Sequence, residues 1–493
     1  MASTPFLNLQ TSSKMRTNSR VLFAGIAMLS LAISACTVPS SMIPRKENAA
    51  VPTSFTGSRD TATVAKLPWR EFFTDPNLTA LIDTALRNNQ ELNIVLQEIN
   101  IARNEVKARK GEYLPFVNVQ GAAGVERAAR YTRAGAVDES TEIEPGKAIP
   151  APLPDYLITA NASWQVDVWK KLRNAKKAAM MRYLATNEGK NFLVTQLIAE
   201  IADSYYELMA LDNQLNILQQ NIEIQQNALE IVKMEKEAAK VTELAVRRFE
   251  AEVLKNQSRL FTIRQQITVT ENRINFLVGR FPQPVQRSSP TFSDLPTNVA
   301  QAGIPSQLLQ NRPDIRRAEM SLAATKLDVA SARANFYPSL DITATVGYEA
   351  FNASYLISRP ESMLYAAAGG LVAPLVNRNA IKAMYYSANA RQVQAVYDYE
   401  RTILNAYIEV ANQLSNINNL QQSYTLRSQQ VQALTQSIDI STRLFKSARA
   451  DYMEVLLTQR DALESKFELV ETKKQQMVAM VNVYQALGGG WER

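Results

Sequence analysis

The sequence predicts a mainly α-helical protein with a small β part, arranged as a tandem repeat. Each half is expected to hold two strands followed by one long helical hairpin. Two observations carry this prediction: long stretches without proline in which apolar residues recur every seven positions, and short segments in which apolar and polar residues alternate strictly. Glycine is also scarce, at 16 of 493 residues, which suits long uninterrupted helices.

The helical part follows from two stretches without proline, 155–281 and 375–493. Apolar residues repeat there with the seven-residue period of helices that pack along one another. We expect one long helix over about 172–235 and another over about 380–447, each roughly 100 Å long at 1.5 Å per residue. A helix of this length cannot bury itself in a compact domain, so it must pack along other helices.

Four segments predict strands, because apolar and polar residues alternate along them. The clearest are 158–168 and 340–348, a shorter one begins at Val117, and the weakest covers 366–376. About ten residues of strict alternation is typical of outer-membrane barrel strands, and the smallest single-chain barrel has about 8 strands. Since open sheet edges are not tolerated in lipid, several chains must share one sheet.

The two halves repeat at constant sequence offsets. Pro115 and Pro338, which each end a helical pattern and open an alternating one, are 223 residues apart. The descending arms of the hairpins match at an offset of 209, and the apolar positions of the ascending arms match at 202. The last two offsets differ by seven residues, which predicts an insertion of one heptad. We therefore expect repeats over 68–280 and 304–493, joined by a linker at 281–303.

The N-terminus has the order of a secretion signal with a lipid-attachment site. A basic segment, 14–20, precedes an apolar run, 21–33, which is too short to cross a bilayer as a helix. The run ends in Ile33-Ser34-Ala35-Cys36, and Cys36 is the only cysteine of the chain. This order resembles a bacterial lipoprotein box. We expect removal of 1–35, lipidation of Cys36 with palmitate, and an extended tether over 36–67; the alternative is a free cysteine after a cleavage site.

Composition argues against an enzyme. The chain has no histidine, which excludes histidine general bases, histidine-containing triads and histidine metal ligands. It also has no phosphate-binding loop and no cluster of metal ligands, so we expect no catalytic residue, cofactor or metal. The net charge of +7 includes three basic residues of the leader, and the remainder is too small to indicate a nucleic-acid partner.

These features, in this order, resemble the TolC-like outer-membrane efflux ducts, specifically the lipoprotein branch that serves RND-type pumps (NodT-like outer-membrane factors). The resemblance runs from Cys36 to Arg493. Each of its motifs also suits a structural position, such as proline in the first turn of a helix, so we expect no chemistry from them. The motifs are Trp69-Arg70-Glu71-Phe72-Phe73-Thr74-Asp75-Pro76, Ile304-Pro305-Ser306, Arg312-Pro313-Asp314-Ile315-Arg316-Arg317-Ala318-Glu319, Phe336-Tyr337-Pro338-Ser339-Leu340 and Leu487-Gly488-Gly489-Gly490-Trp491.

The resemblance implies a homotrimer with a shared twelve-stranded β-barrel in the bacterial outer membrane, continuing into an α-helical barrel in the periplasm. It implies a periplasmic adaptor (membrane fusion) protein and an inner-membrane RND-type pump as partners, besides outer-membrane lipid. The implied function is a passive exit duct for drugs or other small toxic compounds. The alternatives are a duct for type I protein secretion and a lipid-anchored periplasmic coiled-coil scaffold, which would leave the alternating strands unexplained.

The hairpin tips, expected near 236–243 and 446–451, are where the resemblance places the adaptor. Related ducts often carry glycine there, whereas this chain has Ala239 and Ala448. The exposed charged residues of the tips are the candidate adaptor contacts: Lys240, Arg449 and Asp451.

The gate is expected on the second hairpin close to its tip. Related ducts place an aspartate two residues before a Gln-Arg pair; here the pair is Gln459-Arg460, and Leu457 takes the place of the aspartate. An acidic ring is therefore replaced by candidates for an apolar constriction, namely Phe445, Met453 and Leu457. Narrow apolar constrictions can gate by dewetting. The alternative is that these side chains pack one helix against another.

Overall fold

The computed structural model describes residues 38–39, 45–55, 61–296, 301–447 and 449–491. The chain divides into two compact units, each assembled from separate stretches. The first unit contains 102–183 and 321–396, with the residues before 47, and the second contains 47–101, 184–320 and 397–493. Each half of the tandem repeat therefore contributes its strands to the first unit and most of its hairpin to the second.

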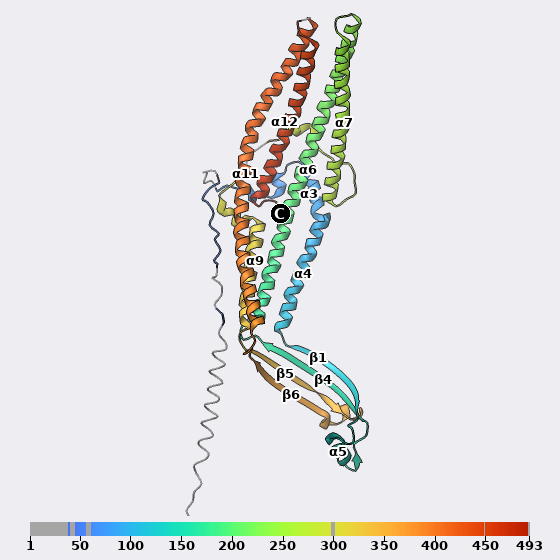
Figure 1. Ribbon diagram of the computed structural model, residues 1–493, viewed down its shortest axis with the longest axis vertical. Coiled ribbons are helices and arrows are strands. Elements are labelled where there is room, and N and C mark those ends of the chain that lie inside the picture. Colours follow the sequence, from blue (N-terminus) through green and yellow to red (C-terminus); the bar gives the residue numbers. More distant parts are fainter. Residues whose placement is uncertain (1–37, 40–44, 56–60, 297–300, 448, 492–493) are drawn as a thin grey trace, which may run out of the picture. The chain divides into compact units, whose positions relative to one another are not determined.

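The helices and strands follow one another as two similar series (Figure 1). The first series is η1 (Val64–Lys66), α2 (Trp69–Phe72), α3 (Pro76–Asn88), α4 (Gln90–Tyr113), β1 (Phe116–Glu126), α5 (Arg133–Ser140), β2 (Glu142–Glu144), β3 (Lys147–Ala148), β4 (Leu153–Val166), α6 (Lys171–Glu237) and α7 (Glu243–Val278). The second is η2 (Ser289–Asp294), η3 (Pro305–Gln307), α8 (Leu308–Asn311), α9 (Pro313–Ala334), β5 (Ser339–Ala350), α10 (Tyr355–Ser358), η4 (Pro360–Ser362), β6 (Met363–Val372), α11 (Asn379–Lys446) and α12 (Tyr452–Ala486).

The first unit holds a four-stranded antiparallel sheet in the order β1-β4-β5-β6, so that β1 and β6 are its edges. All four predicted strands are confirmed, although β4 and β6 begin and end at other residues than predicted. β4 begins at Leu153 because its first residues extend the pairing with the end of β1, as far as Glu126 opposite Leu153. β6 covers Met363–Val372 instead of 366–376, because its pairing with β5 begins at Met363 opposite Tyr348.

The pairing register gathers the apolar residues on one face of this sheet. Directly opposed residues of neighbouring strands share a face, and Trp164 lies opposite Ile342 while Ile158 lies opposite Tyr348. The apolar face is formed by Val117, Val119, Tyr156, Ile158, Trp164, Ile342, Val346, Tyr348, Tyr365 and Leu371. The other face carries Asn118, Gln120, Asn161, Ser163, Gln165, Asp341, Thr343 and Thr345. The strands therefore separate an apolar side from a polar one, as the alternation predicted.

The long helices are α6, with 67 residues, and α11, with 68. Both are confirmed at close to the predicted bounds, and their returning arms, α7 and α12, have 36 and 35 residues. None of the helices in the described part of the chain has a stretch that is both long and apolar enough to cross a membrane.

The predicted insertion of one heptad in the ascending arms is wrong. Lys171 and Asn379, which begin the long helices, are 208 residues apart, and Glu237 and Lys446, which end them, are 209 apart. The offset of 202 arose because a seven-residue apolar pattern matches itself equally well when it is displaced by one heptad. The two hairpins therefore share one offset along their full length.

The core of the second unit lies where α3, α6, α7 and α12 pack together. Its fully buried side chains include Ile82, Tyr205, Leu208, Ile274 and Val481. Each large apolar side chain buried in this way contributes about 1.5–3 kcal/mol relative to an exposed one. Two smaller clusters, around Leu218 and around Val246, continue along the first hairpin toward its tip.

In the second unit, two equivalent junctions each join the end of a returning helix, α7 or α12, to the start of a shorter helix, α4 or α9. At the first, Gly279 ends α7 in the left-handed conformation (φ 76°), and the side-chain amide of Asn89 donates to the carbonyl of Leu277 at 2.9 Å. At the second, Arg312 Nη1 donates to the carbonyl of Ala486, near the end of α12, at 2.7 Å. Asn89 and Arg312 are 223 residues apart, the offset that relates the two predicted repeats.

Glycine is required at both junctions because the backbones approach closely. A Cβ at Gly279 would lie 2.6 Å from the carbonyl oxygen of Asn88, and one at Gly488 (φ 89°) would lie 2.6 Å from that of Asn311. Positive φ is also unfavourable for other residues. The glycines after α7 and α12 thus allow α4 and α9 to begin directly beside the C-terminal ends of these two helices.

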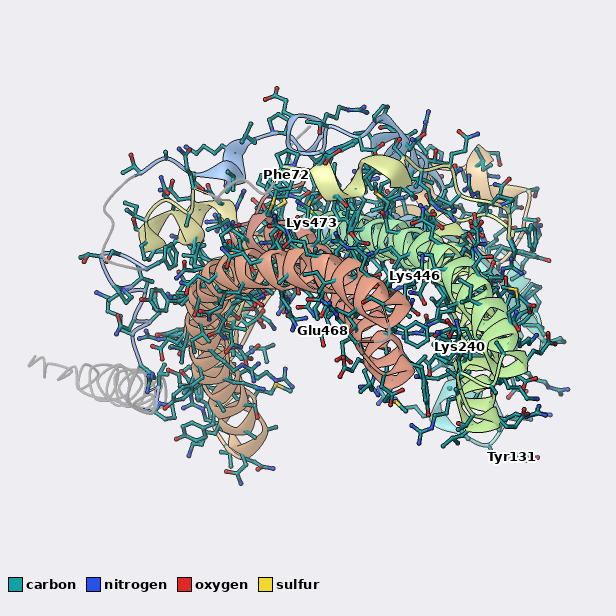
Figure 2. All side chains as sticks on the ribbon, turned by 90° about the horizontal axis from the view of Figure 1, so that it is seen from above. Phe72, Tyr131, Lys240, Lys446, Glu468 and Lys473 are labelled. Atoms are coloured by element: carbon teal, nitrogen blue, oxygen red, sulfur yellow. The ribbon has the colours of Figure 1, made fainter. Side chains whose placement is uncertain are left out.

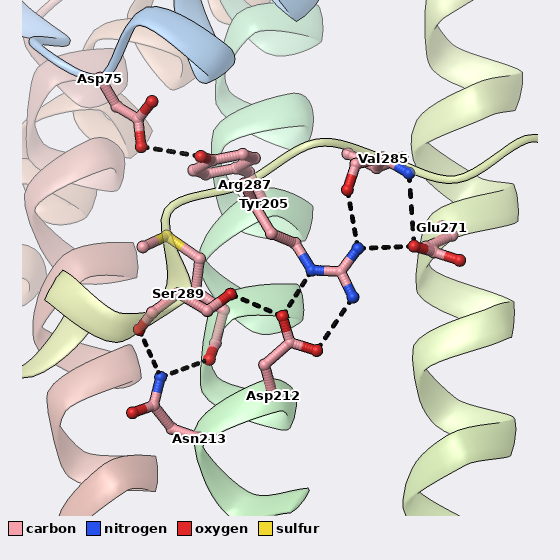
Figure 3. A network of polar contacts seen from close by, with 9 residues as sticks. Asp75, Tyr205, Asp212, Asn213, Glu271, Val285, Arg287 and Ser289 are labelled. Atoms are coloured by element: carbon pink, nitrogen blue, oxygen red, sulfur yellow. Dashed lines mark hydrogen bonds and ion pairs between the residues drawn. The ribbon is translucent and has the colours of Figure 1, made fainter. Parts of the chain in front are cut away.

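Arg287 fastens part of the predicted linker to the hairpin (Figure 3). Its guanidinium pairs with Asp212 of α6 at 2.5 Å and with Glu271 of α7 at 2.5 Å, while the Ser289 hydroxyl donates to Asp212. Burial alone would lower the pKa of Arg287, but these hydrogen bonds outweigh it and raise the pKa. The chain after α7 is therefore held by ion pairs to both arms.

The same unit contains a buried carboxyl group, that of Asp203, which is not fully hydrogen-bonded. Its Oδ1 is buried and has no hydrogen-bond partner in the structure. The pKa of Asp203 is raised to about 7: burial is the largest cause, Arg273 acts in the opposite direction, and Glu200 adds to the rise. Because the folded chain holds this proton more tightly than the unfolded chain, where an aspartate has a pKa of about 3.9, the stabilising contribution is complete below about pH 4 and is lost progressively as the pH rises to 7.

Replacing Asp203 by Asn should therefore stabilise the protein more as the pH rises. At pH 5 the carboxyl is ionised only in the unfolded chain and the variant should be more stable by about 1.5 kcal/mol; at pH 8.5, where it is ionised in both states, the variant should be more stable by about 4 kcal/mol. Thermal unfolding of the detergent-solubilised protein at both pH values measures this. Asp212→Asn serves as the control and should destabilise at both pH values, because it removes a partner of Arg287. Equal unfolding temperatures at pH 8.5 would contradict the assignment.

Candidate functional site

The first hairpin turns between Glu237 and Glu243, as predicted. Ala239 adopts a left-handed conformation (φ 56°), so alanine occupies the backbone position for which glycine is usual. The turn is closed by the N–H of Lys240, which donates to the carbonyl of Glu235 at 2.9 Å. The Lys240 side chain is exposed and marks this hairpin end in Figure 2.

The second hairpin turns between Lys446 and Tyr452. The N–H of Arg449 donates to the carbonyl of Leu444 at 2.9 Å, and Asp451 precedes the first turn of α12. Arg449 and Asp451 are exposed, while Ala448 lies outside the described residues. All three candidate adaptor contacts therefore lie in the turns, where a partner could reach them.

The gate candidates lie beside the buried face of α12. Val455 and Gln459 of this helix are buried, and Leu456 packs against the cluster of the first hairpin. Met453 and Leu457 are four residues apart and share another side of the helix. Leu457 keeps 39% of its surface exposed, so packing within this chain covers its side chain only in part.

Phe445 and Met453 are more enclosed than Leu457. Both are half-buried, and Arg248 of α7 lies against Met453, with its Nη1 3.3 Å from the Met453 sulfur. The structure thus brings all three candidates to the same end of the second hairpin, and Leu457 is the most exposed of the three.

Ion pairs connect α12 with the two neighbouring helices, and the sequence analysis did not identify them. Arg259 of α7 pairs with Glu464 of α12, and Arg427 of α11 pairs with Glu468 of α12, both at 2.8 Å. Arg259 also lies over the ring of Phe467, 4.0 Å from its centroid. These residues line one polar cleft. No local spacing signals the pairs, because the partners come from different helices.

A buried polar pair joins the two arms of the first hairpin. The side-chain amide of Asn256 on α7 donates to Oε1 of Gln225 on α6 at 2.8 Å, and both residues are 1% exposed. The pair lies between the two apolar clusters of this hairpin.

The Arg-Pro-Asp motif has the structural role that the sequence predicted. Pro313 begins α9, and Arg312 pairs with Asp314 and with Glu409 of α11, each at 2.7 Å. Burial would lower the pKa of Arg312, yet its hydrogen bonds to Asp314 and Glu409 outweigh burial and raise the pKa. Since Arg312 also binds the end of α12, the motif connects the beginning of the second repeat to its C-terminal end.

Cys36 lies outside the described residues, and so do 37, 40–44 and 56–60 of the predicted tether. The part of the tether that is described follows α11: Asn48 N–H donates to Glu400 at 3.0 Å, and the ring of Phe55 stacks on that of Tyr407. Among the described residues, no group of three acidic, cysteine or histidine side chains is placed to hold a metal ion.

Known proteins resemble this chain over most of its length. Residues 81–280 and 304–489 match the family described as outer membrane efflux protein. The pyoverdine export outer membrane protein OpmQ of Pseudomonas putida is 28% identical over 468 residues, covering 94% of this chain and 96% of its own. The cation efflux system protein CusC of Escherichia coli is 25% identical over 425 residues, covering 86% of this chain and 88% of its own.

The fold also matches solved channels. The MtrE outer membrane channel of Neisseria gonorrhoeae, solved in its open state, superimposes with a TM-score of 0.79 at 22% identity, covering 92% of this chain and 99% of its own. The family match extends over both halves of the chain, each with its strands and hairpin. The chain therefore belongs to the outer membrane efflux protein family and is an efflux channel of the outer membrane.

Proposed function

We propose that this channel is the passive exit duct of a tripartite pump, through which an inner-membrane RND-type transporter expels drugs or other small toxic compounds. The observation that carries the proposal is the combination, in one chain, of a sheet with one apolar and one polar face and hairpins whose long arms are about 100 Å. The channel itself would supply a water-filled path and a gate, while the pump would select the cargo. Relatives named for pyoverdine and for cations fit a duct that does not choose its cargo.

The working channel is a homotrimer in this proposal. The edge strands β1 and β6 each have one neighbour within the chain, and unpaired backbone groups in lipid are strongly unfavourable. Pairing β6 of one chain with β1 of the next would close twelve strands from three copies. The apolar face would then meet lipid and the polar face would line the lumen.

In this proposal the two repeats, 68–280 and 304–493, form equivalent segments of the duct wall, joined by the linker 281–303. Their hairpin tips are the proposed contact for a periplasmic adaptor, through Lys240, Arg449 and Asp451. The support is geometric: these side chains are exposed and lie in the two turns.

A deletion strain tests the function. Loss of this chain should sensitise the cell to drugs, dyes or metal ions, and the wild-type chain should restore resistance. A strain that keeps its resistance but fails to secrete a protein would show instead that the duct serves type I secretion.

Leu457 is the proposed centre of an apolar gate, with Met453 one turn before it and Phe445 across the hairpin turn. Three copies of an exposed leucine facing a closed lumen would form a ring that water and ions avoid when it is narrow. Splaying of the hairpins upon adaptor binding would widen that ring. The absence of an aspartate at position 457 argues for an apolar rather than an ionic constriction.

Replacing Leu457 by Ser should make the closed duct leak, because a hydroxyl allows water to enter the ring. Single-channel conductance in planar bilayers should rise, and the cell should become more sensitive to large antibiotics. Val455→Ser is the packing control: Val455 is 5% exposed, so this variant should lose stability without a comparable rise in conductance. An intact Leu457→Ser trimer with unchanged conductance would place the constriction elsewhere.

Cys36 is the proposed lipid anchor, on the strength of the charged, apolar and small-residue order that precedes it. A single acyl chain adds about 0.8 kcal/mol per buried CH₂, while the sheet holds the protein in the membrane independently. Cys36→Ser should therefore abolish labelling by radioactive palmitate while leaving part of the efflux activity. Labelling that persists in the Cys36→Ser protein would refute the anchor.

A further inference from the structure

The helix ends that adjoin the sheet in the first unit carry an unusual concentration of positive charge. In the segment 170–177, which contains the start of α6, five of eight residues are Lys or Arg and none is acidic. The end of α4 adds Arg103, Lys107 and Lys110. The small net charge of the whole chain conceals this local excess.

The positive side chains of α4 and α6 lie on adjoining faces. Arg103 and Lys107, like Lys107 and Lys110, are spaced for one face of α4, and Arg173 and Lys177 are spaced for one face of α6. Lys170, in a left-handed conformation (φ 60°), directly precedes α6. Arg103 lies 5.9 Å from the ring of Tyr183 on α6. Arg173 lies 5.8 Å from the ring of Tyr113 on α4. These six residues form the basic patch.

Most of the basic patch forms no ion pair with the described residues, and the two glutamates at this end of α4, Glu105 and Glu112, both pair with Arg109. Lys107, Lys110, Lys170 and Lys177 are exposed and form no ion pair with any described residue. Arg173 alone is engaged, with Asp167 at 3.2 Å, where Asp167 caps the first turn of α6. Four neighbouring lysines without acidic partners repel one another, and a bound anion would relieve that repulsion.

The basic patch adjoins the end of the apolar sheet face. The indole of Trp164, which belongs to that face, donates to the carbonyl of Tyr113 at 3.2 Å. Tyr113 is in turn the residue over whose ring Arg173 lies. Tryptophan and tyrosine concentrate at membrane–water interfaces, so the order from sheet to helix is apolar surface, aromatic ring and cation.

We propose that the basic patch binds the phosphate groups of anionic phospholipids in the periplasmic leaflet of the outer membrane. Cations just outside the apolar region attract anionic headgroups, and the aromatic rings fix the depth at which the headgroup lies. The inference takes from the proposed function only that the apolar face of the sheet meets lipid, and it does not depend on the cargo or the pump.

Native mass spectrometry of the full-length protein in mild detergent tests the binding. Phosphatidylglycerol should be retained more strongly than phosphatidylcholine with the same acyl chains. The variant K107Q/K110Q/K170Q/K177Q should lose affinity for phosphatidylglycerol by roughly tenfold or more, with no change for phosphatidylcholine. The control K233Q/K236Q/K255Q/K446Q removes the same charge from the hairpins, where exposed ion pairs contribute little, and should retain phosphatidylglycerol like the wild type.

Two outcomes would overturn the inference: equal retention of the two lipids by the wild type, or equal retention of phosphatidylglycerol by both variants. A change of ion selectivity in planar bilayers without a change in lipid retention would also overturn it, because the basic patch would then line the water path. The same spectra report the oligomer. A trimer without preferential lipid refutes this inference and leaves the proposed duct standing, whereas a folded monomer contradicts the duct itself.

Discussion

The ends of the returning helices impose the constraint on which the rest of the structure depends. A helix leaves its last carbonyls without partners, and α7 and α12 end inside the second unit. Asn89 and Arg312 donate to these ends, and a left-handed glycine follows each helix. α4 and α9 can therefore begin directly beyond them. Each long helix thereby gains two shorter partners in succession, which is what allows helices of about 100 Å to be covered.

Charge performs a different task in each part of the chain. Around Arg287 and Arg312, buried ion pairs hold segments that have no regular structure or that join two helices. Between α12 and its neighbours, half-exposed pairs such as Arg259–Glu464 connect separate helices. At the helix ends beside the sheet, lysines lack partners. This last arrangement, like the exposed charges of the hairpin turns, leaves charge available to something outside the chain.

The sequence predicts periodic features well and tertiary contacts poorly. Alternation identified all four strands, two of them from about ten residues and two from shorter or weaker patterns, and the seven-residue period within the stretches without proline placed the ends of α6 and α11 to within two residues. The heptad pattern could not give the offset of the ascending arms, because it matches itself after every seven residues. Nor could it bring Arg103 near Tyr183 or Arg259 near Glu464, since these neighbours belong to different helices. Of the gate candidates, it identified an exposed Leu457 but could not show that Arg248 partly covers Met453.

The buried Gln225–Asn256 pair gives the first hairpin a fixed register. A purely apolar heptad seam would allow α7 to slide along α6 by seven residues, about 10 Å, and still match apolar residues with apolar residues. Sliding would carry both side-chain amides into an apolar layer and break the hydrogen bond between them, which costs about 1–3 kcal/mol for each group left unsatisfied. The pair therefore favours one register: the two arms can bend or splay together with the amide contact intact, whereas slipping of one arm along the other would break it.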